Sequence, residues 1–162
     1  MVARRFWQKL IEDAWTRRSI VWLTGVRRTG KTYLSQSLPE VRMFDCELPR
    51  TRRLMEDPEG FLRDHDGLRI VLDEIHRLDD PSQILKIAAD HHPRVRILAI
   101  GSSTLGASRK FRDTLAGRKE SILMAPMNET DLADFGGGRL EDRLLKGGLP
   151  PFYLAEIGRA HV

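Results

Sequence analysis

The pattern that most constrains the fold of this chain is an apolar run that ends in a glycine-rich turn. Residues 19–25 read SIVWLTG, which predicts a short buried strand. After a turn, residues 31–38, KTYLSQSL, predict a helix that ends near Pro39. The turn between them matches the spacing G-x-x-x-x-G-K-[ST] in full, with Gly25, Gly30, Lys31 and Thr32 at the fixed positions.

The residue types in this turn suit a chain of phosphate groups. Glycine lets the backbone curl so that successive N–H groups point at phosphate oxygens, and the helix that follows adds the positive end of its dipole. The Lys31 ammonium is expected to reach the β- and γ-phosphates, and the Thr32 hydroxyl to ligate magnesium. Arg27 and Arg28 occupy variable positions and are expected to point outward to solvent, a partner or a nearby phosphate. Nucleotide contacts are expected from Gly25, Arg28, Thr29, Gly30, Lys31, Thr32 and Tyr33.

A second motif, RIVLDEIHR, supplies two carboxylates. A buried apolar strand over residues 68–74 delivers Asp73 and Glu74 to its carboxyl end, where open parallel sheets bind their ligands. We expect Asp73 to hold the magnesium shell and Glu74 to polarise an attacking water as the catalytic base. The alternative is a pair of acidic residues that only end a strand. His76 follows closely, but a surface or supporting role fits it better than direct participation.

In the rest of the chain, segments with the residue pattern of strands alternate with segments that have the apolar spacing of helices. Strands are expected at 41–48, 95–103 and 119–126 besides the two above. Helices are expected at 2–15, 79–92 and 108–117, with one or two helical turns over 49–64 and a capped segment from Asn128 to Phe135. Strands that alternate with helices predict an α/β fold with a parallel sheet.

Composition narrows the class of protein. The 162 residues suit one domain, and their 41% hydrophobic and 31% charged content is typical of a soluble globular chain. No apolar run approaches the roughly 20 residues of a membrane span, so no membrane partner is expected. The single cysteine, Cys46, suits a cytoplasmic protein and a buried strand thiol. The net charge of +4, with the RTRR run at 50–53, is only a weak indication of nucleic-acid binding.

The roles of five further residues remain open on the sequence alone. Ser102 or Ser103, after the fourth strand, could place a hydroxyl between the water and the γ-phosphate, or could be an ordinary turn residue. Arg118 could act on the nucleotide of a neighbouring subunit, which would imply a homo-oligomer, or form a surface salt bridge. The aromatic face of Phe6 and Trp7 could lie over a base, although such a face more often belongs to the core.

With these residues assembled, the chain resembles the AAA+ superfamily, and within it a prokaryotic group of ATPases that carry a C-terminal domain of unknown function. The resemblance covers about residues 19–150 and rests on TGVRRTGKTYL, VLDEIHRL, ILAIGSSTL, DTLAGRKESILMAPMNETDL and LLKGGLPP. It implies a P-loop NTPase three-layer sandwich with a mainly parallel five-stranded sheet, ATP and Mg²⁺ as cofactors, Ser102 as the sensor and Arg118 as the arginine finger. The expected organisation is an N-terminal helix (1–18), a nucleotide-binding core (19–135) and a hinge or start of a missing C-terminal region (136–162).

Two functions fit these expectations. The first is an ATPase module in which hydrolysis drives a conformational change. The second is a nucleotide-gated switch with little hydrolysis, acting on a protein partner or on the missing C-terminal domain; a DNA-associated ATPase is a weaker alternative. ATP and ADP are the expected ligands in each case.

Overall fold

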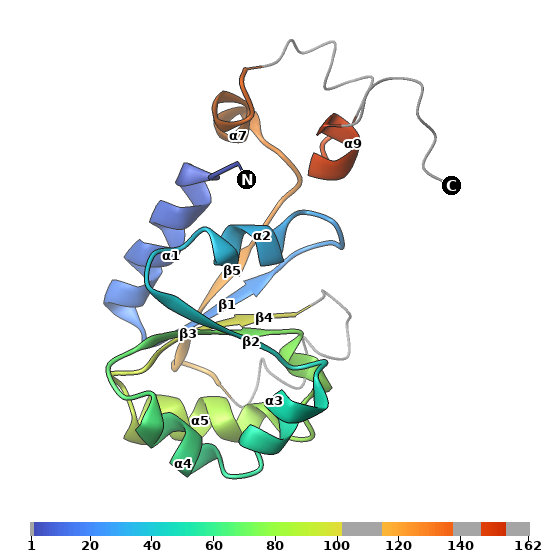
Figure 1. Cartoon of the computed structure of the whole chain (residues 1–162). Helices are drawn as coiled ribbons and strands as arrows, with labels where there is room; N and C mark the ends of the chain where they lie inside the picture. Colours follow the sequence, from blue (N-terminus) through green and yellow to red (C-terminus); the bar gives the residue numbers. More distant parts are fainter. Residues whose placement is uncertain (1, 102–114, 138–146, 155–162) are drawn as a thin grey trace.

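Five parallel strands form the centre of the structure, a computed structural model that describes residues 2–101, 115–137 and 147–154 (Figure 1). The sheet has the order β2-β3-β4-β1-β5, and every neighbouring pair is parallel. This result confirms the expected α/β fold with a parallel sheet. The strands are β1 (Ile20–Thr24), β2 (Val41–Asp45), β3 (Arg69–Asp73), β4 (Arg96–Ile100) and β5 (Lys119–Leu123).

Helices cover both faces of the sheet and make the three layers visible in Figure 1. On one face lie α1 (Arg5–Arg17) and α2 (Lys31–Gln36). On the other face lie α3 (Pro49–Leu54), α4 (Pro58–Asp64) and α5 (Pro81–His91). The short 3-10 helix η1 (Ile75–Arg77) follows β3, and α7 (Glu129–Asp134) and α9 (Pro150–Leu154) lie beyond the carboxyl end of β5.

The strands are buried because their apolar side chains pack into two separate clusters, one on each face of the sheet. Along β1, Ile20 and Trp22 enter the cluster beneath α4 and α5, whereas Val21 and Leu23 enter the cluster beneath α1 and α2. Alternation along a strand sends neighbours to opposite faces, and each face here is covered by helices. This explains why SIVWL reads as a continuous apolar run.

Several element boundaries differ from the sequence-based expectation. Helix α1 begins at Arg5 rather than residue 2 and continues to Arg17. Strand β2 ends at Asp45 because a turn, closed by the Leu48 N–H to the Asp45 carbonyl at 3.2 Å, leads directly into α3. The helical turns expected over 49–64 form two helices, since the Asp57 carboxylate caps a new helix start at α4.

Two other expectations have different outcomes. The capping pattern at Asn128 is confirmed: its side chain accepts from the Asp131 N–H, and the Asp131 carboxylate accepts from the Asn128 N–H, each at 3.0 Å. Most of the helix expected at 108–117 lies outside the described residues. Among the helices that the structure describes, none has the length and apolar character needed to cross a membrane.

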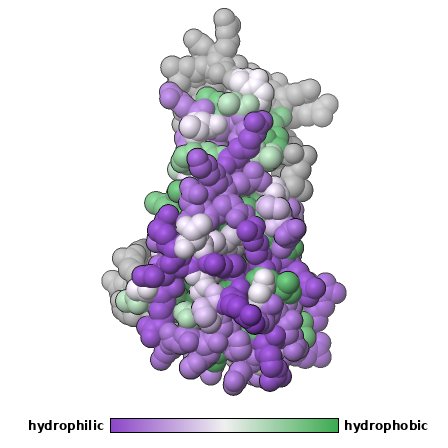
Figure 2. Space-filling model, turned by 90° about the vertical axis from the view of Figure 1, so that its left-hand side faces the viewer, coloured by the Kyte–Doolittle hydropathy of each residue, from purple (hydrophilic) through white to green (hydrophobic). Residues whose placement is uncertain are grey.

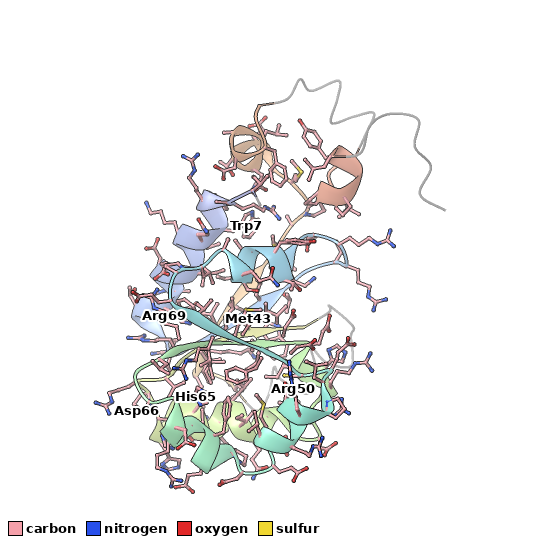
Figure 3. The ribbon with its side chains drawn as sticks, in the orientation of Figure 1. Trp7, Met43, Arg50, His65, Asp66 and Arg69 are labelled. Carbon is pink, nitrogen blue, oxygen red and sulfur yellow. The ribbon has the colours of Figure 1, made fainter. Side chains whose placement is uncertain are left out.

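The side of the molecule on which the strands begin is predominantly hydrophilic (Figure 2). Arg69 and Asp66 lie on this side in the stick view (Figure 3). Charged pairs on this side include Arg69–Glu12 at 2.8 Å and Arg94–Asp66. The opposite edge, where the strands end, carries the candidate site.

Candidate functional site

The turn between β1 and α2 has a conformation that requires glycine at both fixed positions. Gly25 has a φ of +151°, and a Cβ built on it would overlap the backbone carbonyl of Met124 at the end of β5. Gly30 has a φ of +87° and forms the N-terminal boundary of α2. Positive φ values are accessible to glycine at little cost. The glycines of the motif therefore follow from backbone geometry as well as from the close approach of β5.

The Lys31 side chain lies along the loop. Its ammonium donates to the Gly25 and Val26 carbonyls, each at 2.9 Å. Burial lowers the pKa of Lys31, although the nearby Glu74 and Asp73 carboxylates act in the opposite direction. A partly desolvated cation held over a glycine loop is a strong attractor for phosphate oxygens.

Thr32 and Asp73 meet across the interface between α2 and β3. The Thr32 hydroxyl donates to the Asp73 carboxylate at 2.8 Å, and Asp73 is only 8% exposed. A hydroxyl and a carboxylate at this separation offer the hard oxygen ligands that Mg²⁺ prefers, with phosphate oxygens and water to complete its shell. The described residues contain no cluster of three or more His, Cys, Asp or Glu suited to a metal. Thr32 and Asp73 together supply two of the oxygen ligands that a Mg²⁺ ion would need.

Glu74 adopts a left-handed backbone conformation, with φ 50° and ψ 42°. Its N–H donates to the other Asp73 carboxylate oxygen at 3.0 Å. Non-glycine residues seldom adopt this conformation, which costs about 1 kcal/mol or more and often occurs at functional sites. His76 Nδ1 lies 3.2 Å from Glu74 Oε2, within ion-pair range, although the contact does not have hydrogen-bond geometry. His76 therefore lies beside Glu74, a proximity that the sequence left undecided.

Two cavities meet at the loop. A polar cavity of about 430 Å³ is lined by Lys31, Thr32, Asp73 and Glu74 among others. A more apolar cavity of about 580 Å³ lies between α2, α9 and the N-terminal arm, which is the segment of residues 2–4 before α1. Arg28, Gly30 and Tyr33 line both. A polar and an apolar compartment joined in this way match the two ends of a nucleotide.

The other residues expected to contact nucleotide have different positions. Gly25 is buried, and Thr29 is fully buried with its hydroxyl directed to the Val26 carbonyl at 3.0 Å. Thr29 can therefore offer the cavity only backbone groups. Arg27 and Arg28 are exposed, as expected, while both line the polar cavity. Ser102 and Ser103 lie outside the described residues.

Arg118 lies away from the loop of its own chain. It immediately precedes β5, whose first residue, Lys119, pairs with Ile20 at the beginning of β1. The loop follows the opposite end of β1, about four strand residues or ~13 Å further on. Arg118 instead forms a two-pronged contact with Asp90, at 2.7 and 3.2 Å. The surface salt bridge is thus present, and a role at a neighbouring subunit's nucleotide stays a prediction.

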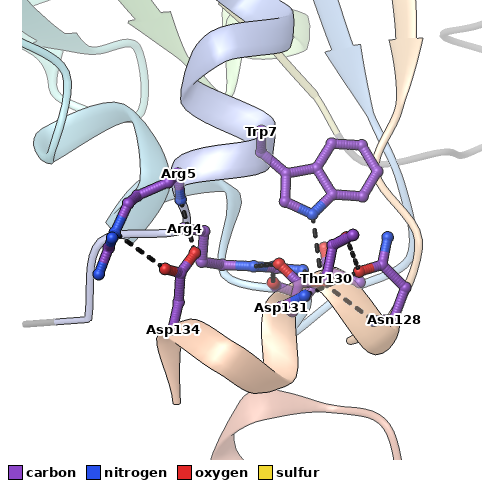
Figure 4. Close-up of polar contacts among 8 residues, drawn as sticks. Arg4, Arg5, Trp7, Asn128, Thr130, Asp131 and Asp134 are labelled. Carbon is purple, nitrogen blue, oxygen red and sulfur yellow. Dashed lines mark hydrogen bonds and ion pairs between the residues drawn. The ribbon is translucent and has the colours of Figure 1, made fainter. Parts of the chain in front are cut away.

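One contact residue of the loop was not anticipated. Arg4, in the arm that precedes α1, is 3% exposed and donates to the Thr29 carbonyl at 2.6 Å. The same guanidinium pairs with Asp131 of α7 (Figure 4). An arginine in a charged amphipathic segment is normally read as solvent-exposed, so the sequence offered no signal for this contact.

Comparison with known proteins assigns the chain to a family. Residues 17–132 match the AAA domain family. Uncharacterised proteins of Mycobacterium bovis and Mycobacterium tuberculosis are each 34% identical to this chain over 161 residues, or 96% of it. The chain spans only 35% of the length of those curated relatives.

A solved structure has a similar fold. The Walker-type ATPase of Pyrococcus abyssi aligns with a TM-score of 0.62 and 14% identity, covering 94% of this chain and 65% of that one. At this identity the likeness concerns the fold alone. The family match over residues 17–132 shows that the chain belongs to the AAA domain family, and its fold is that of a P-loop ATPase.

Proposed function

We propose that the protein binds ATP with Mg²⁺ at the β1–α2 loop and hydrolyses it to drive a conformational change. The observation that carries the proposal is the contact between Thr32 and Asp73 at 2.8 Å, beside Lys31 and Glu74 in one polar cavity. A cation, a hydroxyl and two carboxylates at a glycine loop are the set that phosphoryl transfer to water requires.

Each residue has a distinct role in this proposal. When ATP binds, the Lys31 ammonium gives up its hydrogen bonds to the loop carbonyls and donates to the β- and γ-phosphate oxygens. The loop N–H groups bind the remaining oxygens. Thr32 and Asp73 hold the Mg²⁺ ion, which neutralises phosphate charge when bound. Glu74 immediately follows Asp73, the proposed metal ligand, and its side chain is 35% exposed. Its carboxylate can therefore accept a proton from a water molecule in the cavity.

The apolar cavity accommodates the nucleoside end of the ligand. Tyr33 is 67% exposed at the boundary of the two cavities, in a position to contact a base or ribose. Leu34, Phe135 and Leu154 supply apolar surface to the same cavity. Nucleoside sites are typically apolar clefts with a few polar groups, as here. Trp7 belongs to the core, at 4% exposure, so it does not offer its ring to a base.

Two substitutions separate binding from turnover. Lys31→Ala should abolish ATP binding measured by isothermal titration calorimetry, because it removes the cation at the phosphates. Glu74→Gln should bind ATP with nearly unchanged affinity but lose turnover by about 100-fold or more, because the base is lost. Lys9→Ala and Glu47→Gln, at exposed positions, serve as charge-matched controls. Hydrolysis by Glu74→Gln at the wild-type rate would refute the assigned base.

A nucleotide-gated switch is the second candidate function, and the position of Arg118 favours it. Within one chain this arginine is paired with Asp90 at the end of the sheet where the strands begin. A single chain would then hold ATP without the positive charge that accelerates its cleavage. Tight ATP binding together with negligible single-turnover hydrolysis would support the switch over the ATPase.

A further inference from the structure

A buried ion pair joins the two ends of the described core. Arg4 Nε and Nη2 donate to the two carboxylate oxygens of Asp131 at 2.8 and 2.6 Å, across 127 residues of sequence. The side chains are 4% and 0% exposed. A charge pair so deeply buried is costly to desolvate and carries little stability by itself, so its presence calls for another explanation.

The third contact of Arg4 supplies that explanation. Arg4 Nη1 donates to the Thr29 carbonyl at 2.6 Å, inside the phosphate loop. The carbonyl of Thr29 and the N–H of Gly30 belong to one planar trans peptide group, so they point in opposite directions. Holding the carbonyl towards the arm therefore turns the Gly30 N–H away from the arm. Gly30 lines the polar cavity, where a phosphate oxygen needs such donors.

Asp131 fixes the guanidinium in this orientation. Besides the two bonds from Arg4, its carboxylate accepts the Trp7 indole N–H at 3.2 Å and the Asn128 N–H at 3.0 Å (Figure 4). The carboxylate is thus anchored from α1 and from the first turn of α7. A planar guanidinium can serve a carboxylate and a carbonyl together, which an ammonium cannot do with the same geometry.

We propose that Arg4 is a positioning residue of the phosphate loop, acting through the Thr29 carbonyl, and that Asp131 couples the loop to α7. The proposal rests on nucleotide binding at the loop as proposed above. Its consequence is reciprocal: if α7 influences the loop, nucleotide at the loop must influence α7. The N-terminal arm, the loop and α7 then respond to nucleotide as one unit.

The neighbouring pair offers a matched control. Arg5 also contacts α7, through its N–H at 2.7 Å and its guanidinium at 3.1 Å to the Asp134 carboxylate. Its side chain is 82% exposed, and these contacts do not involve the loop. Arg5→Gln thus removes the same charge and weakens the same α1–α7 contact while leaving Thr29 untouched.

The test compares Arg4→Lys, Arg4→Gln, Asp131→Asn, Arg4→Gln/Asp131→Asn and Arg5→Gln. For each, the Kd of Mg-ATP is measured by calorimetry, and folding is checked by thermal melting without nucleotide. Arg4→Lys keeps the buried charge balanced and is the variant that carries the test if Arg4→Gln fails to fold. We expect Arg4→Lys to raise the Kd about tenfold and Arg5→Gln to leave it within about twofold. The double variant should lose scarcely more affinity than Arg4→Gln alone, because the two residues act as a unit.

Two further measurements distinguish positioning from general support of the fold. In steady-state turnover, Arg4→Lys should raise KM more than it lowers kcat, since loop contacts act on binding. In the wild type, Mg-ATP should slow hydrogen exchange at the α7 amides, whereas Lys31→Ala with Mg-ATP should show no such slowing.

The outcomes separate this proposal from the function on which it rests. If the wild type binds no Mg-ATP, the proposed function fails and the coupling fails with it. If the wild type binds and Lys31→Ala does not, the proposed function stands. In that case, a wild-type Kd in Arg4→Lys, an equal loss in Arg5→Gln, or unchanged exchange in α7 would each overturn the positioning role.

Discussion

Adjacent residues at the end of β3 have different environments. Asp73 is nearly buried and already engaged by Thr32, whereas Glu74 is about one-third exposed and faces the polar cavity. Strand alternation would send these neighbouring side chains to opposite faces, and the left-handed backbone of Glu74 redirects its carboxylate so that both line one cavity. One carboxylate is thereby suited to holding a cation and the other to accepting a proton.

Cys46 gives a prediction at the residue scale. Burial raises the pKa of its thiol to about 12, with a further contribution from the nearby Asp45, Asp73 and Glu74 carboxylates. Only the thiolate reacts with alkylating agents, so native Cys46 should be inert to iodoacetamide at pH 8 and react fully in denaturant. Mass spectrometry of the labelled protein measures this difference. Rapid labelling of the native protein would contradict the buried, protonated thiol.

Polar contacts link the elements around the loop, in addition to the apolar cluster beneath α1 and α2. Helix α1, the loop and α7 converge on the Arg4–Asp131 pair, while β5 approaches Gly25 from the other side. Helix α7 has only six residues, so its capping box and this ion pair hold it more than its own helical propensity does. The conformation of the loop therefore depends on elements far from it in sequence.

The stability of this arrangement should depend on pH. Burial alone would raise the pKa of Asp131, but hydrogen bonds from Arg4, Asn128 and Trp7 outweigh it, so the pKa lies below its ordinary value. The carboxylate therefore stabilises the fold above the ordinary Asp pKa of about 4, and this contribution is lost as pH falls through the lowered pKa. In urea unfolding, Asp131→Asn should cost about 3 kcal/mol at pH 7 and progressively less as the pH falls below about 4.

The matched control for this measurement is the exposed pair. Arg5→Gln, which removes the guanidinium of the Arg5–Asp134 contact, should lower the free energy of unfolding by about 1 kcal/mol or less at pH 7, because solvent screens an exposed guanidinium. An Asp131→Asn variant with the same urea midpoint as the wild type at pH 7 would contradict the expected cost of leaving Arg4 as an unpaired buried charge.

At the scale of the whole molecule, the two edges of the sheet carry different chemistry. The carboxyl ends of the strands hold the loop and the carboxylates, as is usual for ligand sites of open α/β sheets. The amino ends carry arginines that are paired with carboxylates, such as Arg17 with Glu120 and Arg118 with Asp90. This pairing gives no support to a nucleic-acid surface at that edge.

The position of Arg118 leads to a prediction about assembly. If it completes the site of a neighbouring copy, ATP turnover per chain should rise with protein concentration, and Arg118→Ala should lower turnover at high concentration only. Arg17→Ala, which removes another ion-paired arginine of the same edge, should have no such effect. Turnover that is independent of concentration, with wild-type activity in Arg118→Ala, would exclude the trans role.

Local pattern was sufficient for the fold and for the composition of the loop. Buried strands appear in the sequence as apolar runs, because both faces of a parallel sheet are covered. A P-loop is recognisable because it needs its glycines and lysine at fixed spacing. The five parallel strands and the AAA domain family agree with the resemblance drawn from those motifs. The roles of Lys31, Thr32, Asp73 and Glu74 stay predictions, as do the domain boundaries.

Tertiary structure alone decided which distant residues meet the loop. The sequence by itself determined that a strand, a glycine loop and a helix follow one another with the spacing of a P-loop, because those preferences act over a few residues. It could not show that Arg4 and Asp131 pair 127 residues apart, that His76 contacts Glu74, or that Arg118 lies at the opposite edge from its own loop. Such contacts depend on strand order and helix docking, and an arginine has the same local preferences whether it ends in solvent or against a buried carboxylate.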